Sequence, residues 1–167
     1  MPSLYDSFAR YASGLTVVNV AGPVPASFVA GSVLTASVDP FTIAVSVGER
    51  REGLAAMLAG EPWAVSVLAG RHLPLVRAMT AKLPAGLTGA ERRQRRTEAM
   101  LEAGAVASEE GPLWLPDALV TLWCRTHSSV PVHDQVIVVG DVIRGGEHGQ
   151  GQPLVRWDHG FGALADR

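Results

Sequence analysis

The sequence predicts a mainly β fold, a β-barrel of about six or seven strands with short helices between them. Short β-branched runs recur along the chain, and Gly, Pro and Asp turn signals separate them. No long helix follows the first of these runs, which disfavours a doubly wound parallel sheet. The composition, 47% hydrophobic and 18% charged over 167 residues, is typical of one ordered domain. We therefore expect mostly antiparallel pairing that closes into a small barrel.

The N-terminal half contributes the first of these strands. Ser3 is a candidate cap for a short helix that runs to about Tyr11. The stretch 28–38 is extended but rich in small residues, so its backbone can be approached closely. A second short helix is expected at 54–60, where Gly60 ends it. The strands predicted in this half are 15–20, 28–38, 41–47 and 63–69.

The middle of the chain changes in character. After a short helix at 71–79, residues from about 80 to 111 are rich in Ala, Glu and Arg, which indicates a helical insertion. Thr88 and Glu91 have the spacing of a capping box, and Gly104 supplies a stop signal. We expect one domain over 1–167 that carries this insertion.

The C-terminal third returns to strands. The strands predicted here are 119–130, 133–143 and 152–157, and HGFGALADR is expected to be a tail.

Charge and cysteine content exclude several functions. A net charge of −2 does not suit a dedicated nucleic-acid binder. Cys124 is the only cysteine, which suits a reducing cytoplasm and excludes a cysteine-based zinc site. A buried structural thiol is the favoured interpretation of Cys124. The five histidines lack a metal-binding spacing, so we expect no metal. No apolar run is long enough for a signal sequence or a membrane span, so we expect no membrane partner.

Five stretches, taken in order along the chain, carry a family pattern. They are FARYASGLTVVNV, SVLTASVDPFTIAVSV, EPWAVSVLAGRHLPLVRAM, LPDALVTLWCRT and HDQVIVVGDVIRG with QPLVRW. This ordered set resembles the flavin reductase-like family, the FMN-binding split β-barrels. The resemblance covers nearly the whole chain except the insertion, and the ordered set is more specific than any one piece.

The resemblance implies a homodimer with FMN, or FAD, bound between the subunits. It also implies NADH or NADPH as the electron donor, and a free flavin or a partner monooxygenase as the acceptor. Because the hydride passes between the cofactors, no catalytic side chain is expected, and the protein acts mainly by positioning.

The flavin ring is expected against Val29, Ala30, Gly31 and Ser32, which match the family's ring-contacting segment. Ser32 matches a position that commonly carries a hydroxyl. Val29 and Gly31 replace the Thr and the Ser or Asn that the family often has there. The alternative is that these are ordinary barrel-interior residues.

The loop expected to bind the flavin phosphate departs from the family pattern. The family commonly uses an Arg-x-Ser-Thr type loop before a helix, and the matching loop GERREG has Glu52 and Gly53 where the hydroxyl pair would lie. A carboxylate repels a phosphate unless Glu52 turns outward and pairs with an arginine. A solvated charged loop is the alternative. The flavin-binding residues expected here are Val47, Gly48, Arg50, Arg51 and Gly53.

The nicotinamide side is expected at Asp134 and Gln135. In the family an Asp-His pair often lies there, and Gln135 occupies the His position, while the adjacent His133 should point to the other face. The alternative for Asp134 is a turn residue at the start of a strand.

The four arginines between Arg92 and Arg96 spread over a broad helix face, which favours a solvated surface. Alternatively they guide the phosphates of NAD(P)H, or dock a partner. For the whole chain, the function expected is NAD(P)H-dependent flavin reduction. The alternative is a non-catalytic split-barrel module that binds FMN or another cofactor, such as a deazaflavin or heme, with an altered phosphate loop.

Overall fold

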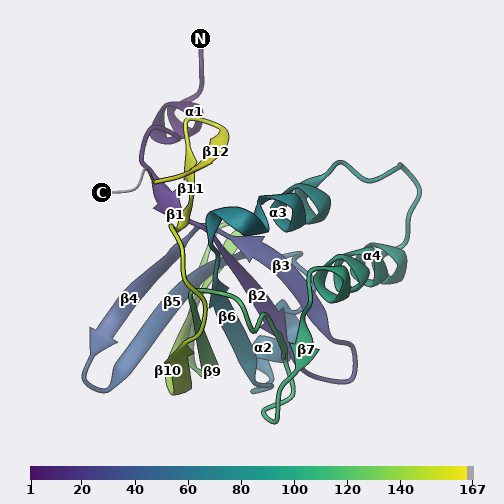
Figure 1. The fold of residues 1–167 in the computed structure, drawn as a ribbon, viewed down its shortest axis with the longest axis vertical. Coiled ribbons are helices and arrows are strands. Elements are labelled where there is room, and N and C mark those ends of the chain that lie inside the picture. Colours follow the sequence, from purple (N-terminus) through teal and green to yellow (C-terminus); the bar gives the residue numbers. More distant parts are fainter. Residues whose placement is uncertain (165–167) are drawn as a thin grey trace.

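A seven-stranded antiparallel sheet organises the computed structural model, which describes residues 1–164 (Figure 1). The prediction of a mainly β fold with short helices is confirmed. The helices are α1 (Leu4–Phe8), α2 (Leu54–Leu58), a 3-10 turn (Gly70–His72), α3 (Leu73–Thr80) and α4 (Gly89–Glu102). The strands of the large sheet are β2 (Thr16–Val20), β3 (Ala26–Ala30), β4 (Val33–Val38), β5 (Phe41–Gly48), β6 (Trp63–Val67), β9 (Val120–Val132) and β10 (Gln135–Glu147). The smaller strands are β1 (Ser13–Gly14), β7 (Val106–Ala107), β8 (Leu113–Trp114), β11 (Leu154–Trp157) and β12 (Gly160–Ala163).

The order of the large sheet is β3-β2-β6-β9-β10-β5-β4, so within residues 1–164 the strands do not close into a hydrogen-bonded ring. The single strand predicted at 28–38 is wrong. Gly31 and Ser32 interrupt it, and β3 and β4 lie at opposite edges of the sheet. The sheet is curled, since Phe28 of β3 packs in the same core cluster as Val45 and Val47 of β5 although β3 and β5 are far apart in the strand order.

Two apolar clusters hold the fold together. The first fills the inside of the curl, where Trp63, Val45 and Met57 are fully buried. The second lies between the sheet and the helices, where Met100 of α4 packs with Leu75 and Val76 of α3. Burial of such side chains typically stabilises a fold by about 1.5–3 kcal/mol each. The sheet therefore has one core within its curl and another under its helical cover.

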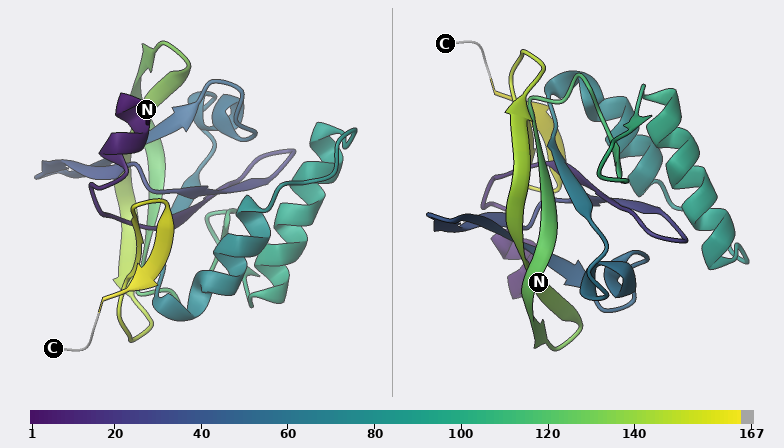
Figure 2. Two further views of the ribbon diagram at one scale, coloured as in Figure 1. Left: turned by 90° about the horizontal axis from the view of Figure 1, so that it is seen from above. Right: turned by 90° about the horizontal axis from the view of Figure 1, so that it is seen from below.

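The helices α3 and α4 lie side by side over the second cluster (Figures 1 and 2). The predicted capping box of α4 is present, because Thr88 Oγ1 accepts the Glu91 N–H at 3.2 Å and Glu91 accepts the Thr88 N–H at 2.7 Å. Gly104, with φ of +91°, follows the helix as the stop signal predicted. No helix within residues 1–164 is long and apolar enough to span a membrane.

A third layer is formed by α1 with the small sheet β1-β11-β12, which stands apart from the main sheet (Figure 1). No residue of α1 is buried, and its cap is Ser3 as predicted. The Trp157 Nε1–H donates to the Arg10 carbonyl at 3.1 Å and ties α1 to β11. The segment expected to be a tail contains β12, so that expectation is wrong up to Ala163; residues 165–167 lie outside the described part.

Candidate functional site

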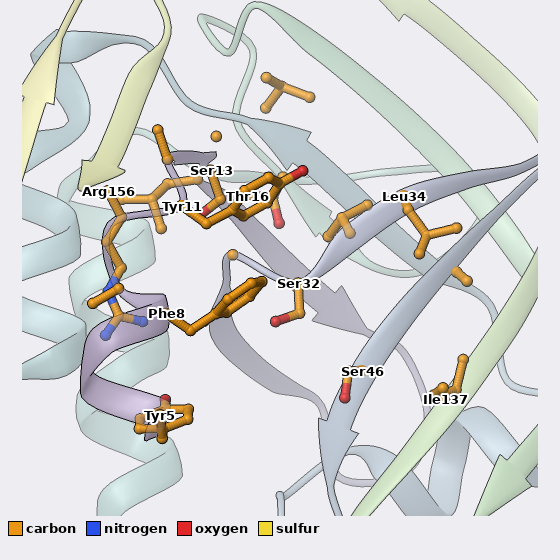
Figure 3. A pocket seen from close by; sticks show the side chains of 18 residues that line it. Tyr5, Phe8, Tyr11, Ser13, Thr16, Ser32, Leu34, Ser46, Ile137 and Arg156 are labelled. Atoms are coloured by element: carbon orange, nitrogen blue, oxygen red, sulfur yellow. The ribbon is translucent and has the colours of Figure 1, made fainter. Parts of the chain in front are cut away.

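An apolar cavity of about 670 Å³ opens between α1 and the main sheet. We call it the apolar cavity. Figure 3 shows the aromatic side chains of α1 and its C-terminal flank on one side, and Leu34, Ser46 and Ile137 on the other. Its volume lies in the range of about 300–1,000 Å³ that is usual for small-molecule sites.

The link between β3 and β4 forms the floor of this cavity. Ser32 lies at its bottom, and the Ser32 carbonyl accepts the Ser46 N–H at 3.0 Å. A Cβ at Gly31 would come within 3.2 Å of Ser13 Oγ, so the backbone here lies tightly against β1. Behind the floor, the Thr16 hydroxyl donates to the Ala30 carbonyl at 2.8 Å. The result is a rigid floor with small side chains, against which a flat ring can lie.

Aromatic rings and one cation form the opposite wall. Phe8 and Tyr11 stack with their centroids 5.3 Å apart and their planes 13° apart. Arg156 reaches toward them from β11, and it is the only charged residue among those of the described chain that line this cavity. A planar, electron-poor ligand would therefore meet aromatic faces on this side.

A second cavity, of about 550 Å³, lies further along the same strands, and we call it the arginine cavity. Its walls come from the loop after β5, from the first turns of α4 and from the β9–β10 turn. The residues that line it are Gly48, Glu49, Arg50, Arg51, Glu52, Arg92, Arg96, Asp134 and Gln135.

Arg51 is an exposed residue whose guanidinium packs against an aromatic ring. Its guanidinium lies 5.7 Å from the centre of the Phe28 ring. Partial burial lowers the pKa of Arg51, and the charge of Arg96 lowers it further, while Glu52 acts in the opposite direction. Arg50, in contrast, is 94% exposed and makes a loose 3.7 Å pair with Glu49. Arg51 is therefore the stronger anion-binding group of the two.

Glu52 pairs with Arg96 of α4. Its carboxylate accepts from Arg96 Nη1 at 3.1 Å, and the two side chains are only 22% and 18% exposed. A carboxylate in this loop is compatible with a bound phosphate only if it pairs with an arginine, and Glu52 makes such a pair. This pair also corrects the expectation of a fully solvated arginine face, because Arg96 faces the protein. The spacing of Arg92 and Arg96, four residues apart, places both on one face of α4.

The two cavities are neighbours along β5 and β10. Ser46 pairs with Ile137 at the apolar cavity, and two residues further Gly48 pairs with Gln135 at the arginine cavity. Alternate residues of a strand share a face and lie about 7 Å apart. The Ser46 hydroxyl lies 3.4 Å from Gln135 Oε1 and bridges the two sites. One elongated ligand can therefore occupy both.

The structure divides the predicted residues among these cavities. Gly31 and Ser32 line the apolar cavity, whereas Gly48, Arg50, Arg51, Asp134 and Gln135 line the arginine cavity. The remaining candidates do not line either cavity: Val47 and Ala30 are buried in the first core cluster, Val29 packs against the second, and Gly53 is the N-cap of α2.

Asp134 lies in the turn between β9 and β10, so the strand expected at 133–143 begins two residues later. His133 has φ of +52° in the same turn. The Asp134 carbonyl accepts the Glu49 N–H at 2.9 Å, so the turn also supports the arginine loop. The alternative of a turn residue at the strand start is therefore the correct one for its backbone.

Sequence reasoning missed several lining residues. Ser46 could have been found by alternation, because its neighbours Val45 and Val47 face the core and Ser46 must face away. The aromatic residues of α1 and Arg156 carried no such signal, because their approach to the cavity depends on the packing of β1 against β11.

The sequence matches the flavin reductase like domain over residues 8–165. The chain belongs to the flavin reductase-like family. Its relatives include the NADH-dependent FMN reductase AsuE2 of Streptomyces nodosus subsp. asukaensis, which is 29% identical over 157 residues, 92% of this chain and 80% of the relative. The reductase component of 4-hydroxyphenylacetate 3-monooxygenase from Thermus thermophilus is 29% identical over 162 residues, 95% of this chain and 93% of the relative.

Solved structures of flavin reductases have the same fold. BorF, the flavin reductase component of a bacterial two-component tryptophan halogenase, superposes with a TM-score of 0.82 at 26% identity. The alignment covers 98% of both chains. The family resemblance inferred from the five ordered stretches is thus confirmed.

Proposed function

We propose that this protein reduces FMN or FAD with electrons from NADH or NADPH. The observation that carries the proposal is the pair of neighbouring cavities along β5 and β10, one apolar and one rich in arginine. A flavin has the matching shape, with a flat ring at one end and a phosphate at the other. Membership of the flavin reductase-like family and relatives named as NADH-dependent FMN reductases support the same assignment.

The residues present fit a flavin. The floor at Gly31 and Ser32 offers backbone groups without bulky side chains, and Ser46 and Gln135 offer polar groups beside it. Arg51 supplies a partly desolvated cation for the phosphate end. The bound ring itself supplies the hydride acceptor.

The side chains of the site act by positioning and by excluding water. Tyr5 and Phe8 of α1, and Tyr11 just after it, line one side of the apolar cavity. Holding two reactants in contact accounts for a large part of such a rate enhancement. No general acid or base is required of this chain.

The reduced flavin leaves for a partner enzyme. The Thermus relative is the reductase component of a monooxygenase, and BorF is that of a halogenase. We propose a flavin-dependent monooxygenase as the acceptor here, in the cytoplasm.

The finer architecture is proposed as an FMN-binding split β-barrel that works as a homodimer, with one domain over 1–167 and a helical insertion at about 80–111. Apolar side chains project from the β4–β5 hairpin, where Val38 is 82% exposed, and from α1. Such exposed apolar surface favours cover by a second copy of the chain.

The test is a steady-state assay of the purified protein. NADH or NADPH is mixed with FMN, FAD or riboflavin, and the loss of nicotinamide absorbance is followed. Oxidation that depends on added flavin is expected. The absence of oxidation above background with every donor and flavin would overturn the proposal, and binding of flavin without oxidation would favour a non-catalytic binding module.

A further inference from the structure

The loop after β5 cannot supply the hydroxyl pair that would normally complete a phosphate site at its end. Glu52 is committed to Arg96. At Gly53 the backbone has φ of +98°, and a Cβ would come within 3.1 Å of both Ala26 and Val20. A serine or threonine at position 53 would therefore be strained and crowded. If a phosphate binds here, its further partners come from another element.

The first turns of α4 are the element that faces this loop. Arg92 and Arg96 line the arginine cavity from α4, across from Arg51. The helix is fixed in this place, because Met100 near its other end is fully buried and Thr88 caps its start. A Cβ at Gly89 would come within 3.0 Å of Glu52 Oε1, so the loop and the helix lie in close contact.

The charges in the cavity leave room for one anion. Its lining holds four guanidinium groups and three carboxylates. Arg50 pairs with Glu49 and Arg96 with Glu52, while Arg92 donates only to the Leu87 carbonyl at 3.3 Å. Within residues 1–164, Arg51 and Arg92 therefore have no carboxylate partner. The third carboxylate, Asp134, lies in the same lining, so four cations and three anions leave a net charge of +1. A phosphate, with about −1.5 to −2 charges, would more than offset this charge.

We infer that α4 completes the phosphate site, and that Arg92 together with Arg51 selects phosphorylated flavin over riboflavin, with Glu52 limiting the strength of the selection. The inference rests on the proposed function. Arg92 is the specificity-determining residue, because it faces the phosphate end and does not reach the ring. Glu52 weakens phosphate binding, because it withdraws the charge of Arg96 and adds a negative charge nearby.

The test compares dissociation constants for FMN and riboflavin, measured by quenching of flavin fluorescence. Arg92→Gln is expected to raise the Kd of FMN about tenfold and to leave that of riboflavin unchanged. Arg95→Gln is the matched control, with the same loss of charge one turn along on the exposed face, and a change below about twofold is expected. Glu52→Gln is expected to lower the Kd of FMN about threefold, again without effect on riboflavin.

Two results would overturn the inference. One is an equal change for Arg92→Gln and Arg95→Gln, and the other is a parallel rise in the Kd of both flavins. Neither result contradicts the proposed flavin reduction, provided that the unaltered protein still oxidises the nicotinamide donor. A protein that binds neither flavin would instead overturn the proposed function together with the inference.

Discussion

Two individual side chains, Cys124 and Arg96, show how far a role could be predicted from the sequence. Cys124 is fully buried, and burial followed by the nearby charge of Asp141 raises the pKa of its thiol to about 12. It is therefore a structural residue, as the sequence indicated. Arg96 shows the opposite, because its place on a polar helix suggested a solvated group and its pairing with Glu52 is visible only in three dimensions.

A second buried group outside the cavities is His72. Its Nδ1 accepts the Ala69 N–H at 2.9 Å, so its Nε2 is the nitrogen placed to donate to Asp117 Oδ1 at 3.1 Å. Arg71 Nε also donates to Asp117, at 3.3 Å. Burial raises the pKa of the Asp117 carboxyl, but the hydrogen bonds and charges of His72 and Arg71 outweigh it and lower the pKa overall.

We predict a pH-dependent contribution from Asp117. A carboxylate with a lowered pKa stabilises the fold above its ordinary pKa of 3.8, and the contribution is lost as the pH falls through the lower folded value. Asp117→Asn is expected to cost up to about 1 kcal/mol at neutral pH, since the side chain is half exposed and screened.

Urea unfolding across the acid range measures this effect. The difference between Asp117→Asn and the unaltered protein should shrink as the pH drops below 3.8. Glu109→Gln, at an exposed site, serves as the control and should show no such trend. A difference that stays constant with pH would contradict the assignment.

At the scale of elements, the sequence predicted helix ends better than strand boundaries, because a helix cap depends on neighbouring residues and a strand depends on distant ones. The cap Thr88 was predicted from its spacing to Glu91, and the cap Ser3 from its position before a short helix; both caps are present. The break between β3 and β4 was missed, because Gly31 and Ser32 continue a run of small residues and only distant pairing separates the two strands. The short strands β1 and β12 were missed because they form only by pairing with β11.

The cap of α4 can be tested directly. Thr88→Ala removes the acceptor of the Glu91 N–H and is expected to destabilise the protein by about 1 kcal/mol. Thr97→Ala, in the interior of the same helix, is the control and should be neutral or slightly stabilising, because alanine has the higher helix propensity. The midpoints of urea unfolding compare the two, and equal midpoints would rule out the cap as a stabilising feature.

For the whole molecule, sequence reasoning predicted the class of fold, and the residues it named for the ring and the phosphate include lining residues of the two neighbouring cavities. It did not predict that α4 faces the loop at 48–53, because these segments are distant in the chain and tertiary packing, with Met100 in the second core cluster and Arg96 paired with Glu52, brings them together. The same holds for α1, whose aromatic residues line the apolar cavity on the side opposite Leu34 and Ile137 (Figure 3).

The proposed homodimer makes a prediction at this scale. Val38→Glu places a charge on the exposed hairpin and is expected to convert a dimer into a monomer in sedimentation equilibrium, with an unchanged circular dichroism spectrum. Val24→Glu is the matched control, since Val24 is 52% exposed at the turn between β2 and β3 and lies away from the hairpin (Figure 1). A protein that sediments as a monomer before any substitution would refute the proposal.

The two-residue link between β3 and β4 also bears on the stage of folding at which the apolar cavity forms. Its ends belong to the two edge strands of the sheet, so it adopts its final course only after the strands between them have assembled. Such long-range pairings form slowly. A ligand of this cavity therefore recognises the finished protein alone, and it prolongs the lifetime of the native state without speeding its formation.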